Sequence, residues 1–313
     1  LTPVYVGLTD KYDAKWIVII ASISVCLACF SLWFFAVGFW STCLIWGVVG
    51  SGLAGTYMPG LQVLNDRLNM TDRVKLTPWY TSSFGLSNGI SFAVIGYLFA
   101  NFSWKIACYT TSISAALSAI IILFLITSHN QKKNITERKF FDLRPAFKNK
   151  EALGYIFSYG THTYELFAYR AWIFIFLLWA SLRTPNTISS ELISLVIGIF
   201  MFIGMVSSLM GAKFCFDYGR KKVLMIIGFA TFVFSVICAI SISLPLWVII
   251  ILVGIYHAFI MLDSGALTAG TVSVSNDNER GAILAFHSII GFAGGAIAGP
   301  IIGFILDING GTN

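Results

Sequence analysis

Long apolar runs dominate this sequence and limit what the chain can fold into. Nine of them cover roughly residues 16–38, 41–64, 77–100, 104–127, 153–181, 188–212, 223–243, 246–273 and 282–306. A helix needs about 20 consecutive, mainly apolar residues to cross a bilayer. One such run could be the core helix of a soluble domain. Nine in succession predict an all-α, polytopic membrane protein.

Composition supports this prediction and excludes other classes of protein. Charged residues make up 11% of the chain, apolar residues make up 57%, and the mean hydropathy is +0.83. A soluble domain carries about 25% charged residues. The net charge of +6 does not indicate a nucleic-acid partner, because the basic residues lie in loops between apolar runs and not on a soluble domain.

Basic residues gather in one of the two alternating sets of loops. The opposite set holds only Lys105 and Arg183. Loops rich in Lys and Arg stay on the cytoplasmic side of a membrane. The linker 127–151 is therefore predicted to face the cytoplasm, together with the loops that hold Lys11, Lys15, Arg67, Arg73, Lys75, Arg220, Lys221, Lys222 and Arg280.

The sequence also repeats weakly, with an offset of 207 positions that separates Asp10 from Asp217. Runs that start near 16, 41 and 77 correspond to runs that start near 223, 246 and 282, within about two residues. Each repeat then holds six spans, an even number, so both copies point the same way, as in parallel transporter repeats. The other matching pairs are Lys15 with Lys222, Arg73 with Arg280, and Gly96 with Gly303.

Two corresponding loops carry a similar pattern of Gly, Asp and basic residues. They read "GLTDKYDAKW" (7–16) and "GAKFCFDYGRKKVL" (211–224). Both resemble the loop signature G-x-x-x-D-R-x-G-R-R/K of the major facilitator superfamily. The first loop has Asp13 where the family usually has Gly, and the second places Asp217 one residue closer to its Gly than expected. The glycine-rich run "GFAGGAIAGPIIG" (291–303) resembles a second signature of that family.

This resemblance implies a helical fold of two six-helix bundles, with twelve spans in all. The chain would be a fragment that covers the third to the eleventh span. Residues 1–126 would then form an N-terminal bundle, 127–151 the cytoplasmic linker, and 152–313 a C-terminal bundle. The implied location is the plasma membrane, here expected to be a bacterial inner membrane, and the implied state is a monomer in the lipid bilayer.

The resemblance implies that the chain is a secondary carrier, a symporter or antiporter that moves a small solute by alternating access. We expect no enzyme, because the sequence has no HExxH, nucleophile or Walker motif. Cofactors and metals are not expected. The paired loop charges are expected to hold a cytoplasmic gate shut, or only to orient the chain; they are Asp10, Lys15, Arg73, Asp217, Arg220 and Arg280.

Ionisable residues inside the apolar runs indicate where the solute and coupling ion bind. A charge at the bilayer centre costs about 2.5–3.5 kcal/mol on insertion scales, so such residues face a bundle interior or a wet cavity. The run 153–181 contains three of them, the run 246–273 contains two, and the last run contains His287. The expected solute- and ion-binding residues are His162, Tyr164, Glu165, Tyr169, Arg170, Trp172, His257 and Asp263.

Helical geometry assigns roles within this set. His162 and Glu165 are three residues apart and can share a proton, so we expect them to carry the coupled proton. Arg170 lies about 140° around the helix from Glu165. It therefore needs an acidic group elsewhere, which favours a solute with a carboxylate or a similar anionic group.

Structural explanations stay open at this stage. Arg170 could pair with a backbone carbonyl or with Asp263, and His162 with Glu165 could form a fixed hydrogen-bonded pair. The aromatic residues could merely pack. The alternative functions are a facilitator or exporter of neutral or amphipathic compounds, in which the aromatic residues bind, and a transport-dead sensor on the same fold.

Overall fold

The computed structural model describes residues 1–9, 12–129, 143–184, 187–276 and 279–310. Within these ranges the regular structure is helical throughout. The predicted all-α membrane fold is therefore confirmed. The chain divides into two compact units, one made of Leu1–Ser83 with Tyr97–Phe140, the other of Phe84–Gly96 with Phe141–Asn313. Most of the predicted linker, residues 130–142, lies outside the described residues.

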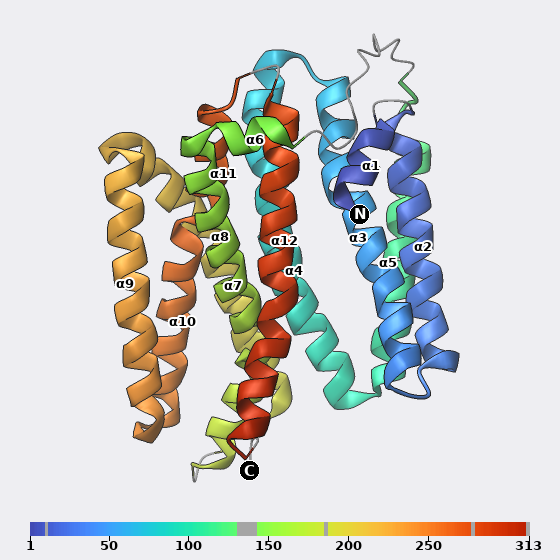
Figure 1. Cartoon of the computed structure of the whole chain (residues 1–313). Helices are drawn as coiled ribbons and strands as arrows, with labels where there is room; N and C mark the ends of the chain where they lie inside the picture. Colours follow the sequence, from blue (N-terminus) through green and yellow to red (C-terminus); the bar gives the residue numbers. More distant parts are fainter. Residues whose placement is uncertain (10–11, 130–142, 185–186, 277–278, 311–313) are drawn as a thin grey trace. The chain divides into compact units, whose positions relative to one another are not determined.

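In the first unit, helix α2 packs against both α3 and α5 (Figure 1). Ala14 and Val18 of α2 are buried against Val63 of α3. These helices are only weakly amphipathic: apolar side chains occur on their outer faces as well, because those faces are in contact with lipid. The elements are α1 (Thr2–Thr9), α2 (Ala14–Phe35), α3 (Phe39–Arg67), α4 (Met70–Asn101) and α5 (Trp104–Leu125), and the middle of α4 belongs to the second unit.

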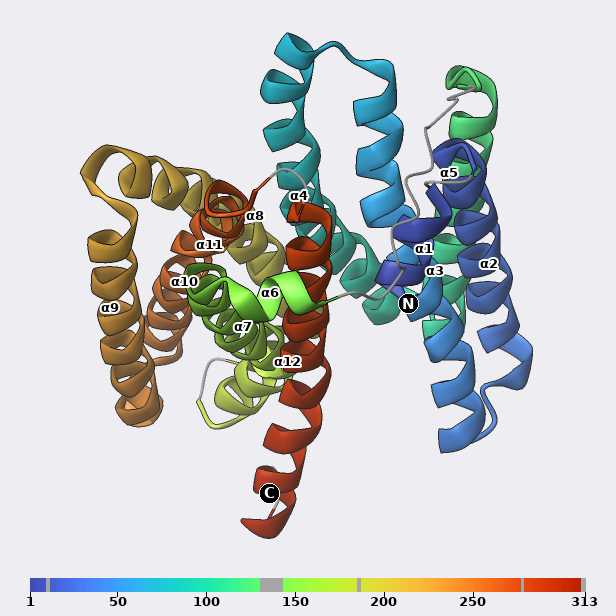
Figure 2. The same cartoon turned by 45° about the horizontal axis from the view of Figure 1, so that its top comes forward.

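The second unit is built around α7, which packs against α8, α10, α11 and α12. The short helix α6 lies across the ends of α7 and α12 (Figure 2). The elements are α6 (Arg144–Lys148), α7 (Lys150–Leu182), α8 (Ser190–Tyr218), α9 (Arg220–Ile240), η1 (Ser241–Ser243), α10 (Leu246–Leu262), α11 (Ser264–Ser273) and α12 (Arg280–Ile308).

Polar caps set where several of these helices begin. The Asn149 side chain accepts a hydrogen bond from Ala152 N–H at the start of α7, and Ser189 accepts one from Leu192 N–H at the start of α8. Such caps satisfy backbone donors that have no partner within the helix. Gly219 has φ of +91° between α8 and α9, a conformation that residues with a Cβ rarely adopt.

Eight segments of the described chain are long and apolar enough to cross a membrane, whereas the sequence predicted nine. The difference is α3, which forms as a continuous helix where the second run was expected but is absent from the eight. Its length is sufficient at 29 residues. Its apolar character is diluted by Gly, Ser and Thr residues and by Pro59, which lies inside the helix.

Glycines let α12 approach α7 closely. A Cβ added at Gly294 would collide with the Gly160 carbonyl oxygen, and one at Gly291 would collide with the Tyr159 ring. Thr163 Oγ1 donates a hydrogen bond to the Gly291 carbonyl across the same interface, at 2.8 Å. Small residues have this role wherever helices associate in lipid, because association there depends on close packing.

At one end of the first unit, Asp13 joins three segments. Its carboxylate accepts hydrogen bonds from Arg67 Nη2, at 3.0 and 3.1 Å, and from the backbone N–H groups of Lys15 and His129. Arg67 also donates to the Thr127 carbonyl. Burial alone would raise the pKa of the Asp13 carboxyl, but these hydrogen bonds and the Arg67 charge outweigh it and lower the pKa.

We predict that Gly294→Ala destabilises the protein, because the added methyl group meets backbone and not a flexible side chain. Overpacking of this kind costs about 1–3 kcal/mol. Gly154→Ala on α7 is the matched control, since a Cβ there meets nothing within 4 Å. The measurement is the apparent melting temperature in detergent. Equal or higher melting temperatures for both variants would contradict close α7–α12 packing.

We predict that Asp13→Asn lowers stability at neutral pH by about 1–3 kcal/mol, the cost of leaving buried donors without their acceptor. Because the folded-state pKa is lowered, the carboxylate stabilises the fold above its unfolded pKa of about 3.9 and loses that effect as pH falls through the folded value. In thermal unfolding, the difference in stability between the parent and Asp13→Asn should therefore be larger at pH 7 than below pH 4. Asp307→Asn, at an exposed position, is the control.

Candidate functional site

Most of the ionisable residues predicted inside the spans come together along one side of α7, facing α10, α11 and α12. His162 and Tyr169 are buried, whereas Glu165 and Arg170 are half-buried. All of them belong to the second unit. The interior of this unit therefore holds both acidic and basic groups, each of which needs a partner in a medium without water.

His162 contacts Asp263, which lies between the end of α10 and the start of α11. The Nδ1–Oδ1 distance is 2.6 Å, which is that of an ion pair, although the contact does not have the angles of a hydrogen bond. The His162 side chain is 1% exposed and the Asp263 side chain is 23% exposed. The partner of His162 is therefore the predicted acid from the other run, and not Glu165.

Glu165 has a different partner on α10. The Tyr256 hydroxyl donates to Glu165 Oε1 at 2.6 Å. No hydrogen bond joins His162 to Glu165 among the described residues, so the pair that their spacing suggested is wrong as a direct contact. Charge still links the three groups, because both His162 and Asp263 interact electrostatically with Glu165.

Arg170 has no carboxylate partner within the described parts of the chain. Its guanidinium lies over two phenyl rings, with Cζ 5.7 Å from the centre of Phe84 and 5.9 Å from that of Phe167. Its Nε is buried and makes no hydrogen bond. A cation over an aromatic face gains roughly 0.5–2 kcal/mol, which offsets only part of the cost of burying the charge. Asp263, the structural partner considered from the sequence, contacts His162 instead.

His257 is fully buried, with 0% of its surface exposed. Its ring stacks on Tyr169 at 4.8 Å, and neither ring nitrogen has a hydrogen-bond partner among the described residues. Gly204 on α8 makes room for it, because a Cβ there would lie 2.6 Å from His257 Nε2. Tyr169 donates to the Val253 carbonyl at 3.2 Å. This pair connects α7 to α10 by packing.

The remaining two predicted residues differ in their contacts. Trp172 Nε1 donates to the Gly299 carbonyl on α12 at 3.2 Å, and its ring packs against Gly303. Trp172 thus joins α7 to α12. Tyr164 is half-buried, and neither a hydrogen bond nor a ring contact is found for it in the described chain. Of the eight predicted residues, it is the least constrained.

Two tyrosines that sequence reasoning missed complete the cluster. Tyr159 stacks between two imidazoles, 5.8 Å from His162 and 3.9 Å from His287. Tyr256 is the donor to Glu165. The sequence contained a signal for each, because Tyr159 lies three residues before His162 on the same helical stripe and Tyr256 precedes His257. His287 is itself held by Thr271 Oγ1, 3.1 Å from its Nδ1.

The predicted gate charges are only partly described. Lys15 is buried and donates to the Leu123 carbonyl at 3.0 Å, whereas Asp217 is exposed at the end of α8. Arg220 donates from Nη1 to Ser273 Oγ at 2.7 Å, which joins α9 to α11. Asp10 and the side chains of Arg73 and Arg280 lie outside the described residues. The gate itself therefore stays a prediction.

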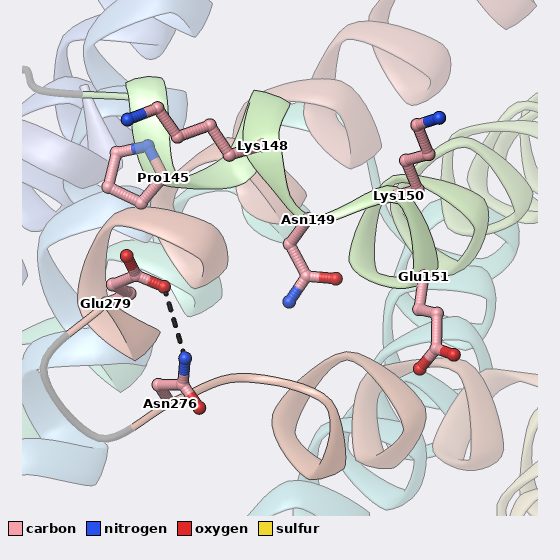
Figure 3. Close-up of a pocket in the computed structure, with 7 residues that line it drawn as sticks. All are labelled: Pro145, Lys148, Asn149, Lys150, Glu151, Asn276 and Glu279. Carbon is pink, nitrogen blue, oxygen red and sulfur yellow. Dashed lines mark hydrogen bonds between the residues drawn. The ribbon is translucent and has the colours of Figure 1, made fainter.

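A surface hollow of about 420 Å³ lies apart from this cluster, where α6 meets α7. It is lined by Pro145, Lys148, Asn149, Lys150, Glu151, Asn276 and Glu279. The ammonium groups of Lys148 and Lys150 point away from its centre, and Asn276 donates to Glu279 at 3.5 Å across its floor (Figure 3). Asn149 also donates to the Val274 carbonyl, so this region joins α7 to the end of α11.

The cluster in the second unit can bind ions and hydrogen-bond a solute, but it does not have the arrangement of a metal site. No group of three or more His, Cys, Asp or Glu side chains suited to a metal occurs in the described part of the chain. Its imidazoles are divided between Asp263, Tyr169 and Thr271. The groups present are those that exchange protons and balance charge.

Comparisons with known proteins agree with this fold. The model of the Major Facilitator Superfamily matches residues 1–184, and that of the family "Sugar (and other) transporter" matches residues 139–311. No curated protein matches the chain.

Solved structures include two similar ones, both of a bacterial homologue of the human lysosomal transporter Spinster. The inward-facing, unoccupied form has a TM-score of 0.69 at 13% identity, covering 98% of this chain and 71% of that one. The inward-facing, occupied form has a TM-score of 0.62 at 15% identity, covering 99% and 80%. These likenesses concern the fold. With more than half of its length matched by the family model, the chain belongs to the major facilitator superfamily.

Proposed function

We propose that this member of a transporter family is a secondary carrier that moves a small anionic solute by alternating access, coupled to protons. The observation that carries the proposal is the Arg170 guanidinium, which has no acidic partner among the described residues and lies over the rings of Phe84 and Phe167. An arginine inside a membrane bundle needs a counter-charge. A solute carboxylate or a similar anion would supply it while bound.

The chemistry of arginine supports an anion as the solute. A guanidinium presents donors in a planar fork that matches two oxygens of a carboxylate, and burial strengthens such bonds. His257, buried near Arg170 with both nitrogens unpaired in the described structure, offers a second polar group to a bound solute.

Proton coupling is supported by the density of titratable groups in the second unit. His162, His257 and His287 lie with Glu165 and Asp263 in one bundle, where charges are costly and changes of protonation are effective. The sequence contains no nucleotide-binding motif, so the energy comes from an ion gradient or from the solute's own gradient, and the density of titratable groups favours protons. We place the carrier as a monomer in the plasma membrane, here a bacterial inner membrane, with the linker 127–151 in the cytoplasm.

The second candidate function is transport of a neutral or amphipathic compound. Phe84, Phe167 and the weakly constrained Tyr164 favour it, because their aromatic surfaces could receive such a solute directly. In that case Arg170 would serve only to fill the space between the rings. Comparing the response of the parent and of Arg170 variants to anions with the parent's response to neutral or amphipathic compounds separates the two candidates.

We predict that Arg170→Lys and Arg170→Ala weaken anion binding by roughly 10- to 100-fold, the loss of hydrogen bonds to a charged group. The measurement is the thermal shift of the purified protein with acetate, benzoate, nitrate and phosphate, since a ligand that binds the folded state raises its stability.

Arg183→Lys is the matched control, because Arg183 also ends over an aromatic ring, that of Trp179, but is exposed at the end of α7. It should bind as the parent does. If the parent shows no shift with any of these anions but a shift with amphipathic cations or neutral drugs, the second candidate replaces the first. Equal anion affinity in parent and Arg170→Ala would make Arg170 a structural residue.

A further inference from the structure

We infer that the coupled proton is held by His162 and Asp263, at the junction of α10 and α11, and not by Glu165. This inference rests on the proposed proton-coupled transport and specifies its ion site. It replaces the His162–Glu165 pair that helical spacing alone suggested. The contact that carries it is the 2.6 Å approach of His162 Nδ1 to Asp263 Oδ1.

The position of Asp263 distinguishes it from Glu165. One apolar segment, Leu246–Ser273, is long enough to span the membrane, and α10 meets α11 within it at Asp263, which keeps α-region dihedrals of φ −90° and ψ −18°. Gly211 on α8 lies directly against the Leu262 carbonyl at this junction, where an added Cβ would collide. A local irregularity in a membrane-spanning helix is tolerated where its backbone is buried in protein or lines a cavity.

The surroundings of the pair favour the gain and loss of one proton. His162 is almost fully buried, whereas the Asp263 side chain is 23% exposed and is the more accessible member of the pair. The other titratable groups that face the pair are Tyr159 and Glu165 on α7, Cys215 on α8, His257 on α10 and His287 on α12. None of these is a fixed cation, and His162 is the basic side chain that contacts Asp263 among the described residues.

Two protonation states follow from this arrangement. With one additional proton, the pair is an imidazolium beside a carboxylate and has no net charge. When that proton leaves to water, a neutral imidazole faces a carboxylate, and the pair carries one negative charge in a medium of low polarity.

The chemistry of the pair selects a proton over a metal cation. The imidazole nitrogen occupies the position beside Oδ1 that a cation would take, and no group of three metal-type ligands occurs in the described residues. Glu165 lacks these properties, because Tyr256 already donates to its carboxylate from an unbroken part of α10. We therefore assign Glu165 a positioning role between α7 and α10.

Proton loss at this pair would act directly on the backbone. Asp263 is the only residue between α10 and α11, and α11 packs against both α7 and α8. A change in the attraction between His162 and Asp263 therefore changes the strength of the contact between α7 and the junction of α10 and α11. This provides a physical link between protonation and movement of one half of the span relative to the other.

The test begins with proton binding and needs no solute. The protein, labelled with ¹³C-histidine in lipid nanodiscs, contains four histidines. Its imidazole signals are followed against pH, with the His162 signal assigned by His162→Gln. In Asp263→Asn, we expect the proton concentration at the midpoint of the His162 signal to change at least tenfold. It should move far less in the matched, isosteric Glu165→Gln.

A His162 signal that does not titrate while the protein stays folded would overturn the inference, as would an equal or larger shift in Glu165→Gln. Because this experiment uses only protons, its failure leaves the anion proposal standing. Conversely, absence of binding in the anion panel would not affect its outcome.

The transport arm uses liposomes and radiolabelled benzoate, acetate, nitrate or phosphate, taking whichever gives the largest thermal shift. Asp263→Asn should abolish accumulation driven by a pH gradient and keep solute exchange, whereas Glu165→Gln, even if it slows transport, should keep accumulation dependent on the pH gradient. Accumulation that persists in Asp263→Asn contradicts the assignment. Accumulation in the parent that follows a Na⁺ gradient and ignores the pH gradient contradicts it as well.

Discussion

A polar group inside a bilayer must find its partner within the protein, and the second unit is organised by this requirement. Helix α7 carries His162, Glu165 and Arg170 within a segment long and apolar enough to cross the membrane. His162 contacts Asp263, between α10 and α11, and Glu165 contacts Tyr256 on α10. Each contact replaces hydration that the side chain loses on insertion, so the polar groups decide which helices surround α7.

Close packing makes these contacts geometrically possible. Gly291 and Gly294 bring α12 against the backbone of α7, and Gly204 opens the space that the His257 ring fills. In lipid there is no hydrophobic force between helices, so van der Waals contact and hydrogen bonds must hold them together. Small residues therefore set the distance between helices, and buried polar side chains form hydrogen bonds and ion pairs across that distance.

Arg170 is the exception to this pattern, which is why it carries the functional proposal. The other ionisable side chains of the predicted site, apart from His257 and Tyr164, have a polar partner in the described structure. Arg170 has only aromatic faces. A cation retained without a counter-charge is costly. Proton binding at His162 and Asp263 and anion binding at Arg170 would occur in the same unit, close enough for one to alter the field felt by the other.

The sequence alone determined the class of fold and predicted which residues form the site. Apolar runs of about 20 residues specify helices because a lipid environment leaves the backbone no other partner, and ionisable residues within them mark the bundle interior. His162, Glu165, Arg170, His257 and Asp263 could all be selected in this way. The loop and glycine patterns also identified the family that the comparison confirms.

The tertiary structure decided which of these residues are partners. Spacing placed His162 and Glu165 on the same side of α7, but it cannot tell which neighbouring helix each side chain reaches. His162 reaches Asp263 at the junction before α11, and Glu165 reaches Tyr256 one to two turns earlier on α10. Hydrogen bonds and ion pairs act over about 3 Å, whereas helical periodicity fixes only direction around one axis. The packing of α7 against its neighbouring helices therefore decided which residue each of these side chains contacts.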